Sequence, residues 1–140
     1  MDLEATIQQF QRAAVEFAKG NPEPVKTIFS HRDDVVLANP FGPAVTGWKK
    51  VSAALDLASS RFRDGDVTGF ERVASYATSD LACIHEVERW RAKVAGRQDL
   101  ASFDLRVSST FRRENGEWKL VHRHADTITA TQPADAVLRK

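Results

Sequence analysis

The sequence predicts an α+β domain in which N-terminal helices pack on a strongly curved, mainly antiparallel sheet that encloses a pocket. Helical hydrophobic patterns come first, and four long extended stretches follow them with no helix between. This order favours segregated helix and sheet layers over alternating βαβ units. Strands of about a dozen residues, against a usual five or six, must curl as they twist, so the sheet acquires a concave side where a pocket can form.

The composition is that of one domain without a polyanionic partner. The 140 residues are enough for a single hydrophobic core. Lys and Arg number 20 against 19 Asp and Glu, so no field of one sign favours nucleic acid or a membrane surface. Cys83 is the only cysteine and the N-terminus has no secretory pattern, so we expect a cytoplasmic protein without disulfides. We place the domain at residues 1–132 and a tail at 133–140.

Three helices are predicted before the extended region. Apolar residues step by three and four from Leu3 to Phe17, and Asp2 is placed to cap the first turn. A second, short helix opens at Pro22, because proline is favoured in a first turn. A third helical pattern runs from about Gly47 to Phe62, and we expect the turn-forming sequence Asp64 to Asp66 to terminate it.

The extended region predicts an antiparallel meander. Its stretches are Val67 to Ala77, Leu81 to Val94, Leu100 to Arg113, and Glu117 to about Thr129. Asn115-Gly116 joins the last two and is a strong hairpin signal, because both residues tolerate positive φ. A shorter β-rich run at Val35 to Leu37 precedes them, and the loop Asn39 to Pro43 stops it because two prolines interrupt pairing.

Alternation along the last stretch predicts which side chains face the pocket. Side chains of a strand alternate between faces, so Trp118, Leu120, His122, His124 and Asp126 should share one face. The first residues of that set are apolar and the last are titratable. This gradient suits a cone that is packed at one end and hollow at the other.

Two glutamates of the second stretch are further candidates for the concave face. Glu86 and Glu88 share their face with Ile84 and Trp90, so we expect one of them to be buried, the alternative being a solvated strand face. If Arg106 also points inward it should pair with Glu88, because a buried charge without a partner costs several kcal/mol. Alternation alone leaves open which face of the third stretch is concave.

Two segments carry a resemblance to a known family. The stretches Asp80 to Arg89 and Leu105 to Asp126 resemble the C-terminal half of SnoaL-like proteins of the NTF2-like superfamily, and Asn39 to Gly42 and Gly47-Trp48 fit the same pattern. The resemblance implies an NTF2-like cone with a ketosteroid isomerase-like fold. It also implies a homodimer formed through the outer face of the sheet. Members include isomerases, cyclases, dehydratases and non-catalytic association domains.

One chemistry of that superfamily is disfavoured here. The ketosteroid isomerases place an aspartate, their general base, immediately before a Pro-Val-Gly turn that resembles Pro40-Phe41-Gly42. This sequence has Asn39 at that position. An amide cannot accept a proton at neutral pH, so the steroid isomerase base is absent.

The sequence therefore predicts a small-molecule-binding protein of unknown substrate. One hypothesis is an isomerase, cyclase or lyase in which His124 is the acid or base, Asp126 or Glu86 orients it, and His122 assists. The alternative is a non-catalytic binding or association module, in which the histidines have a structural role. The candidate ligand-contacting residues are Glu86, Glu88, Arg106, Asn39, Phe41, Trp48 and Tyr76.

Several of these candidates have simpler interpretations. His122 and His124 have the i, i+2 spacing of a chelating pair, but one pair is a weak metal signal, and we expect neither a metal nor another cofactor. Trp48 is also explained as a core anchor and Tyr76 as an ordinary strand aromatic. Cys83 is expected to be an inert, buried thiol.

Overall fold

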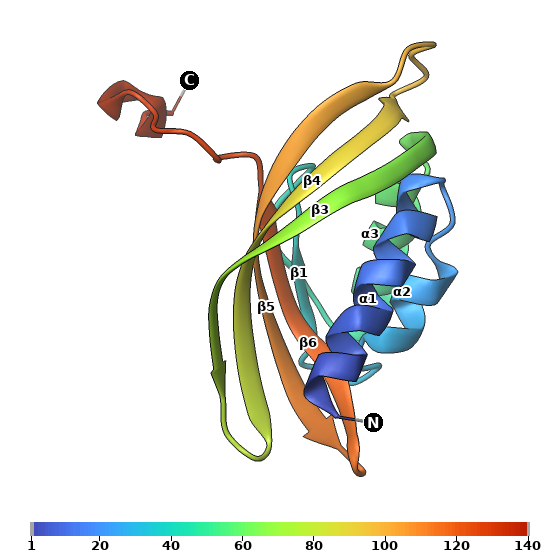
Figure 1. Cartoon of the computed structure of the whole chain (residues 1–140), viewed down its shortest axis with the longest axis vertical. Helices are drawn as coiled ribbons and strands as arrows, with labels where there is room; N and C mark the ends of the chain where they lie inside the picture. Colours follow the sequence, from blue (N-terminus) through green and yellow to red (C-terminus); the bar gives the residue numbers. More distant parts are fainter. Residues whose placement is uncertain (1, 140) are drawn as a thin grey trace.

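The computed structural model describes residues 2–139, which form helices packed on the concave side of one curved six-stranded sheet (Figure 1). The elements are α1 (Leu3–Ala18), α2 (Glu23–Ile28), β1 (Val36–Ala38), β2 (Val45–Thr46), α3 (Trp48–Ser59), β3 (Phe62–Ala77), β4 (Leu81–Val94), β5 (Ala101–Glu114), β6 (Glu117–Asp126) and a 3-10 turn η1 (Ala134–Val137). The predicted α+β fold with a curved, mainly antiparallel sheet is confirmed.

The strand order combines the predicted meander with a crossover. The sheet runs β2-β1-β6-β5-β4-β3, so the four long strands pair with their sequence neighbours. Only β1 is parallel to its neighbour, β6, and every other pairing is antiparallel. The small strand β2 was not predicted, because its two residues are too few to give a periodic pattern. No helix in residues 2–139 has the length and apolar character needed to cross a membrane.

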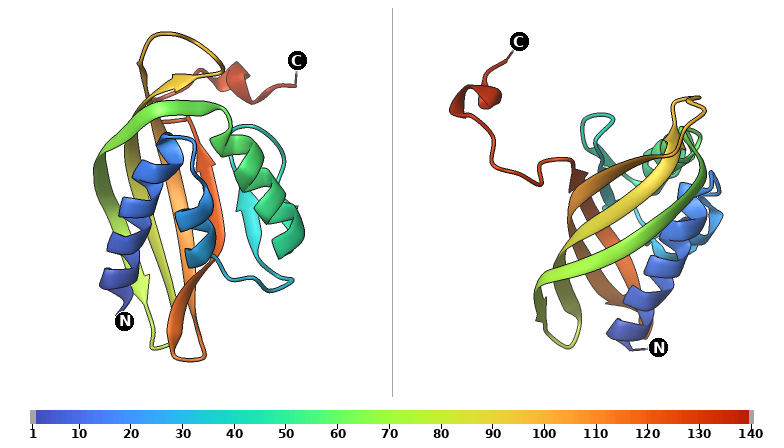
Figure 2. Two further views of the ribbon diagram at one scale, coloured as in Figure 1. Left: turned by 90° about the vertical axis from the view of Figure 1, so that its right-hand side faces the viewer. Right: turned by 45° about the horizontal axis from the view of Figure 1, so that its top comes forward.

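Helix α1 combines an N-terminal cap with one apolar face. The backbone N–H of Ala5 donates to Asp2 Oδ1 at 2.8 Å and completes the N-terminus of α1. The buried face of α1 includes Ile7, Phe10 and Phe17, which pack toward the sheet. Figure 2 shows α1, α2 and α3 together on the concave side, so the apolar core lies between the helices and the sheet.

The segment expected to separate α3 from the first long strand is part of that strand. β3 begins at Phe62, and its pairing with β4 is irregular between Arg63 and Asp66. A Cβ atom at Gly65 would lie 2.5 Å from the carbonyl oxygen of Ala18 and 2.7 Å from the Cβ of Ala92. Glycine is therefore required here for the close approach of the α1 end to the sheet.

A β-bulge in β6 changes which side chains face the helices. Thr110 pairs with His122 and Phe111 pairs with Leu120, so Val121 is an extra residue on the β6 side. Leu120 and Val121 are both buried, whereas strict alternation allows only one of them to be. A bulge inserts one residue and shifts the phase of every side chain beyond it.

The segment after β6 projects away from the domain. Residues Thr127–Arg139 are all exposed and include η1. Figures 1 and 2 show this segment on the side of the sheet opposite the helices. The predicted tail from Pro133 therefore carries a short 3-10 turn, and the departure from the sheet starts earlier, at Thr127.

Candidate functional site

A cavity of about 370 Å³ lies between the helices and the concave face of the sheet. Its walls come from α1, α2, α3, the β1–β2 loop and strands β3 to β6. The lining side chains are mostly apolar or aromatic, and the polar ones are Asn39, Arg97, Ser102, Arg123 and Thr127. This volume and this composition are typical of sites that hold one small molecule.

Three aromatic rings form one wall of the cavity. Phe62, Trp90 and Phe103 lie with ring centroids 5.6 to 5.8 Å apart, and Phe103 stacks on both of the other rings. They come from β3, β4 and β5, so the sheet curvature brings them together. Rigid aromatic faces offer a large apolar contact area to a flat ligand.

A buried ion pair lies beside this apolar space. Arg123 donates from Nη1 to Glu88 Oε2 at 3.0 Å and from Nη2 to Glu88 Oε1 at 2.9 Å, which is a bidentate geometry. Trp90 Nε1 donates to Glu88 Oε1 at 3.0 Å, and the guanidinium carbon of Arg123 lies 5.0 Å from the ring centroid of Phe10. Arg123 is thus held in place while its side chain lines the cavity.

Phe41 lies at the open side of the cavity. Its residue surface is 42% exposed, and the Arg61 guanidinium carbon lies 4.5 Å from its ring centroid. The ring also lies 6.0 Å from Phe62 in the cavity wall. The exposed lining residues Arg97 and Ser102 surround the same opening.

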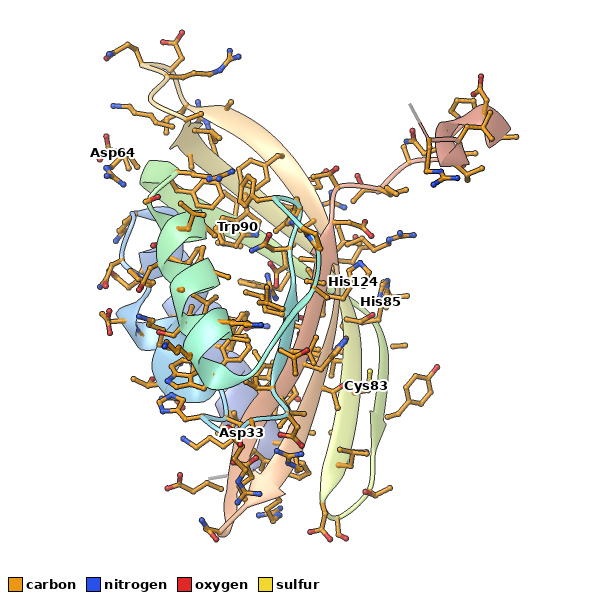
Figure 3. The ribbon with its side chains drawn as sticks, turned by 180° about the vertical axis from the view of Figure 1, so that it is seen from behind. Asp33, Asp64, Cys83, His85, Trp90 and His124 are labelled. Carbon is orange, nitrogen blue, oxygen red and sulfur yellow. The ribbon has the colours of Figure 1, made fainter. Side chains whose placement is uncertain are left out.

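The residues proposed as catalytic lie outside the cavity. His122, His124 and Asp126 are on the convex face, because the bulge at Val121 reverses the phase of β6 and turns Arg123 inward instead. The shared inward face predicted from alternation is therefore wrong. Figure 3 shows His124 on the convex side of the sheet, and Trp90 on the helix side.

The convex histidine and aspartate take part in a surface network. His124 Nε2 lies 3.3 Å from Asp126 Oδ2, and the His124 side chain is 54% exposed. Arg106 donates to both carboxylate oxygens of Asp126, at 3.0 and 2.8 Å. These hydrogen bonds lower the pKa of Asp126 below its usual value. Arg106 therefore pairs on the outside with Asp126, and the inward pairing with Glu88 considered above is wrong.

Glu86 and Glu88 are both buried on the concave side, at 5% and 1% exposure. Glu86 accepts a hydrogen bond from Arg72 Nε at 3.1 Å, and Arg72 also contacts Glu4. Burial raises the pKa of Glu86, and the bond to Arg72 opposes that shift only in part. Neither glutamate is among the lining residues, but Glu88 holds one of them, Arg123.

The other sequence candidates divide between the cavity and the surface. Asn39 and Phe41 line the cavity. Trp48 instead stacks on His31 with centroids 3.8 Å apart. Tyr76 is 70% exposed and pairs with Cys83 on the convex face, so it does not reach the cavity. Within residues 2–139, no three His, Cys, Asp or Glu side chains converge as a metal site would require.

Sequence reasoning missed Arg123 and the aromatic wall. The adjacent buried pair Leu120-Val121 was an available signal for a bulge, since two apolar residues in succession interrupt an alternating strand. Phe62 was missed for a different reason. It was assigned to the end of α3, where it belonged by helical spacing, but it opens β3.

The SnoaL-like domain model matches residues 3–129, and the chain belongs to that family. An NTF2-like superfamily protein from Salmonella enterica subsp. enterica serovar Typhimurium str. LT2 is similar in structure, with a TM-score of 0.78 and 15% identity over 94% of this chain and 92% of that one. A ketosteroid isomerase-like protein from Erwinia carotovora atroseptica SCRI1043 gives a TM-score of 0.74 and 16% identity, covering 91% and 95%. A candidate dehydratase of the NTF2-like family from Streptomyces avermitilis gives 0.71 and 19%, covering 91% and 94%. No curated protein is a significant match to this sequence.

Proposed function

We propose that this SnoaL-like protein binds one small, largely apolar molecule in the concave cavity and positions its polar group near Arg123. The observation that carries the proposal is the apolar space of about 370 Å³ with one bidentate ion pair, Arg123 with Glu88, at its wall. The aromatic wall of Phe62, Trp90 and Phe103 favours a ligand with a flat ring system.

Binding without proton transfer is the role that the lining supports best. An isomerase or lyase needs a group that accepts and returns a proton near neutral pH. The titratable residues in the lining are Arg97 and Arg123, and arginine stays protonated in proteins. The names of two similar structures, a candidate dehydratase and a ketosteroid isomerase-like protein, make catalysis by His124 the second candidate. That candidate requires a substrate on the convex face, where His124 and Asp126 lie 3.3 Å apart.

A homodimer and a cytoplasmic location belong to the same proposal. The convex sheet face is open in the single chain. It carries uncharged side chains, including Cys83, Val87, Ser108 and Thr110, beside the ion pair of Arg106 with Asp126. The uncharged part of this face and the internally paired charges are what support contact between two copies there.

The test uses 8-anilinonaphthalene-1-sulfonate, a fluorescent probe with a flat apolar body and one anionic group. We expect saturable binding of one probe per chain. Ala101→Trp at the exposed rim should obstruct the cavity and weaken binding, whereas His124→Gln on the opposite face should leave it unchanged. Equal binding by the Ala101→Trp variant and the wild type would contradict the cavity assignment. Loss of binding in His124→Gln would favour the second candidate.

A further inference from the structure

The segment Thr127–Arg139 presents apolar side chains that its own domain does not cover. Ile128 is 46% exposed, Val137 85% and Leu138 67%. The segment nevertheless has local order, because Leu138 N donates to the carbonyl oxygen of Asp135 at 3.0 Å in the 3-10 turn. Grouped apolar residues exposed on an extended arm favour contact with another surface.

The arm lies on the side of the convex sheet face. Figure 3 shows His124, His85 and Cys83 on the same side of the sheet as the projecting segment. The helices and the cavity lie on the other side (Figure 2). Beyond Thr127, which lines the cavity, the arm therefore extends away from the helices and toward the space that a molecule on the convex face would occupy.

Several charges around the convex face are paired within the chain. Arg89 donates to Asp104 at 3.0 Å, and Arg106 donates to Asp126 at 2.8 Å. The centre of the face carries His85 and Ser108, which share a hydrogen bond of 3.0 Å. A surface on which both signs of charge are present and several are paired internally suits a second copy of the same surface better than a strongly charged partner.

We propose that Thr127–Arg139 is a clasp that docks on the convex face of a second copy of this chain. The inference rests on the proposed homodimer and adds that each copy holds the other through this segment. In a two-fold dimer the contact occurs twice, so Ile128, Val137 and Leu138 contribute from both copies.

The decisive experiment compares self-association by sedimentation velocity over a range of protein concentrations. Val137→Asp with Leu138→Asp should raise the dimer dissociation constant by about tenfold or more, because the buried apolar contact of both arms is lost. Since both side chains are exposed in the single chain, the substitutions should not unfold it. Leu57→Asp is the matched control, because Leu57 is a 58% exposed apolar residue on α3, and it should not change the dissociation constant.

A second readout follows the half-buried thiol of Cys83 on the convex face. Alkylation of Cys83 should slow as the wild type dimerises and should remain fast in the arm variant at the same concentration. A dissociation constant unchanged by the two aspartates would overturn the clasp, as would protection of Cys83 that does not depend on concentration, since that indicates an arm folded on its own sheet.

Failure of the clasp is distinguishable from failure of the dimer or of the binding function. If Ser108→Arg dissociates the dimer but the arm variant does not, the clasp is wrong and the dimer stands. A wild type that stays monomeric at every concentration would overturn both. Binding of 8-anilinonaphthalene-1-sulfonate should be the same in the arm variant as in the wild type, so the cavity assignment is tested separately.

Discussion

Two arginine–carboxylate pairs lie on opposite faces of the same sheet and differ mainly in their burial. Arg123 with Glu88 and Arg106 with Asp126 are both bidentate, with bonds of 2.8 to 3.0 Å. The inner side chains are 10% and 1% exposed, and the outer ones 45% and 23%. Equal hydrogen-bond geometry can therefore carry unequal energy, because only the inner pair leaves a buried, uncompensated charge when one partner is removed.

The largest expected effect comes from breaking the inner pair. Arg123→Leu should lower the free energy of unfolding by about 3–5 kcal/mol, because it leaves Glu88 buried and unpaired. Urea denaturation measures the loss. The double variant Glu88→Leu with Arg123→Leu is the control, and it should recover most of the stability because both charges are gone. A double variant as unstable as the single one would show that packing, and not charge, sets the cost.

Removing the indole hydrogen bond tests how the inner pair is supported. Trp90→Phe deletes the N–H that donates to Glu88 Oε1 and should cost about 1–3 kcal/mol, the range for losing a bond to a charged group plus some packing. The same substitution in the double variant that lacks Glu88 should cost less. An equal cost in both backgrounds would mean that the indole acts only through its volume.

A third pair, Glu86 with Arg72, has intermediate exposure and gives a pH test. Burial raises the pKa of Glu86 in the folded protein, so its contribution to stability is present below its usual pKa and is lost as pH rises through the higher folded value. The stability of Glu86→Gln minus that of the wild type should therefore be larger at pH 7 than near pH 4. Thermal unfolding at both pH values checks this expectation. A difference of the opposite sign would indicate that the bond from Arg72 outweighs burial.

The smallest effect is expected at the outer pair. Because Arg106 lowers the pKa of Asp126, the pair stabilises the fold above the usual aspartate pKa and stops doing so as pH falls through the lower folded value. Asp126→Asn should lower the melting temperature slightly at neutral pH and low salt, and the difference should disappear in high salt. A loss that persists in high salt would contradict the description of this pair as screened.

The helices and the hairpin could be predicted because their causes are local. Asp2 caps α1 within one turn, and Asn115-Gly116 sets its hairpin through two adjacent positive φ angles. The strand faces required information from a neighbouring strand. Whether Val121 is an extra residue depends on how Leu120 and His122 align with β5, and alternation within β6 does not contain that information.

The sequence predicted a concave-side pocket with a buried glutamate–arginine pair, but it identified only some of the residues that form them. A buried glutamate implied an arginine partner, and Glu88 has one, but it is Arg123 and not Arg106. Asn39 and Phe41 line the cavity, and their contact with a ligand stays a prediction. The aromatic wall depends on the curvature of three strands, so no single stretch of sequence could reveal it.

The bulge at Val121 also determines which polar side chains of β6 face the cavity. Deletion of Val121 would restore strict alternation and keep the other side chains on their present faces, with Leu120 and Arg123 inward and His124 outward. If instead the full-length strand paired without a bulge, the residues beyond Leu120 would change face, and His122 and His124 would replace Arg123 and Ala125 on the concave side.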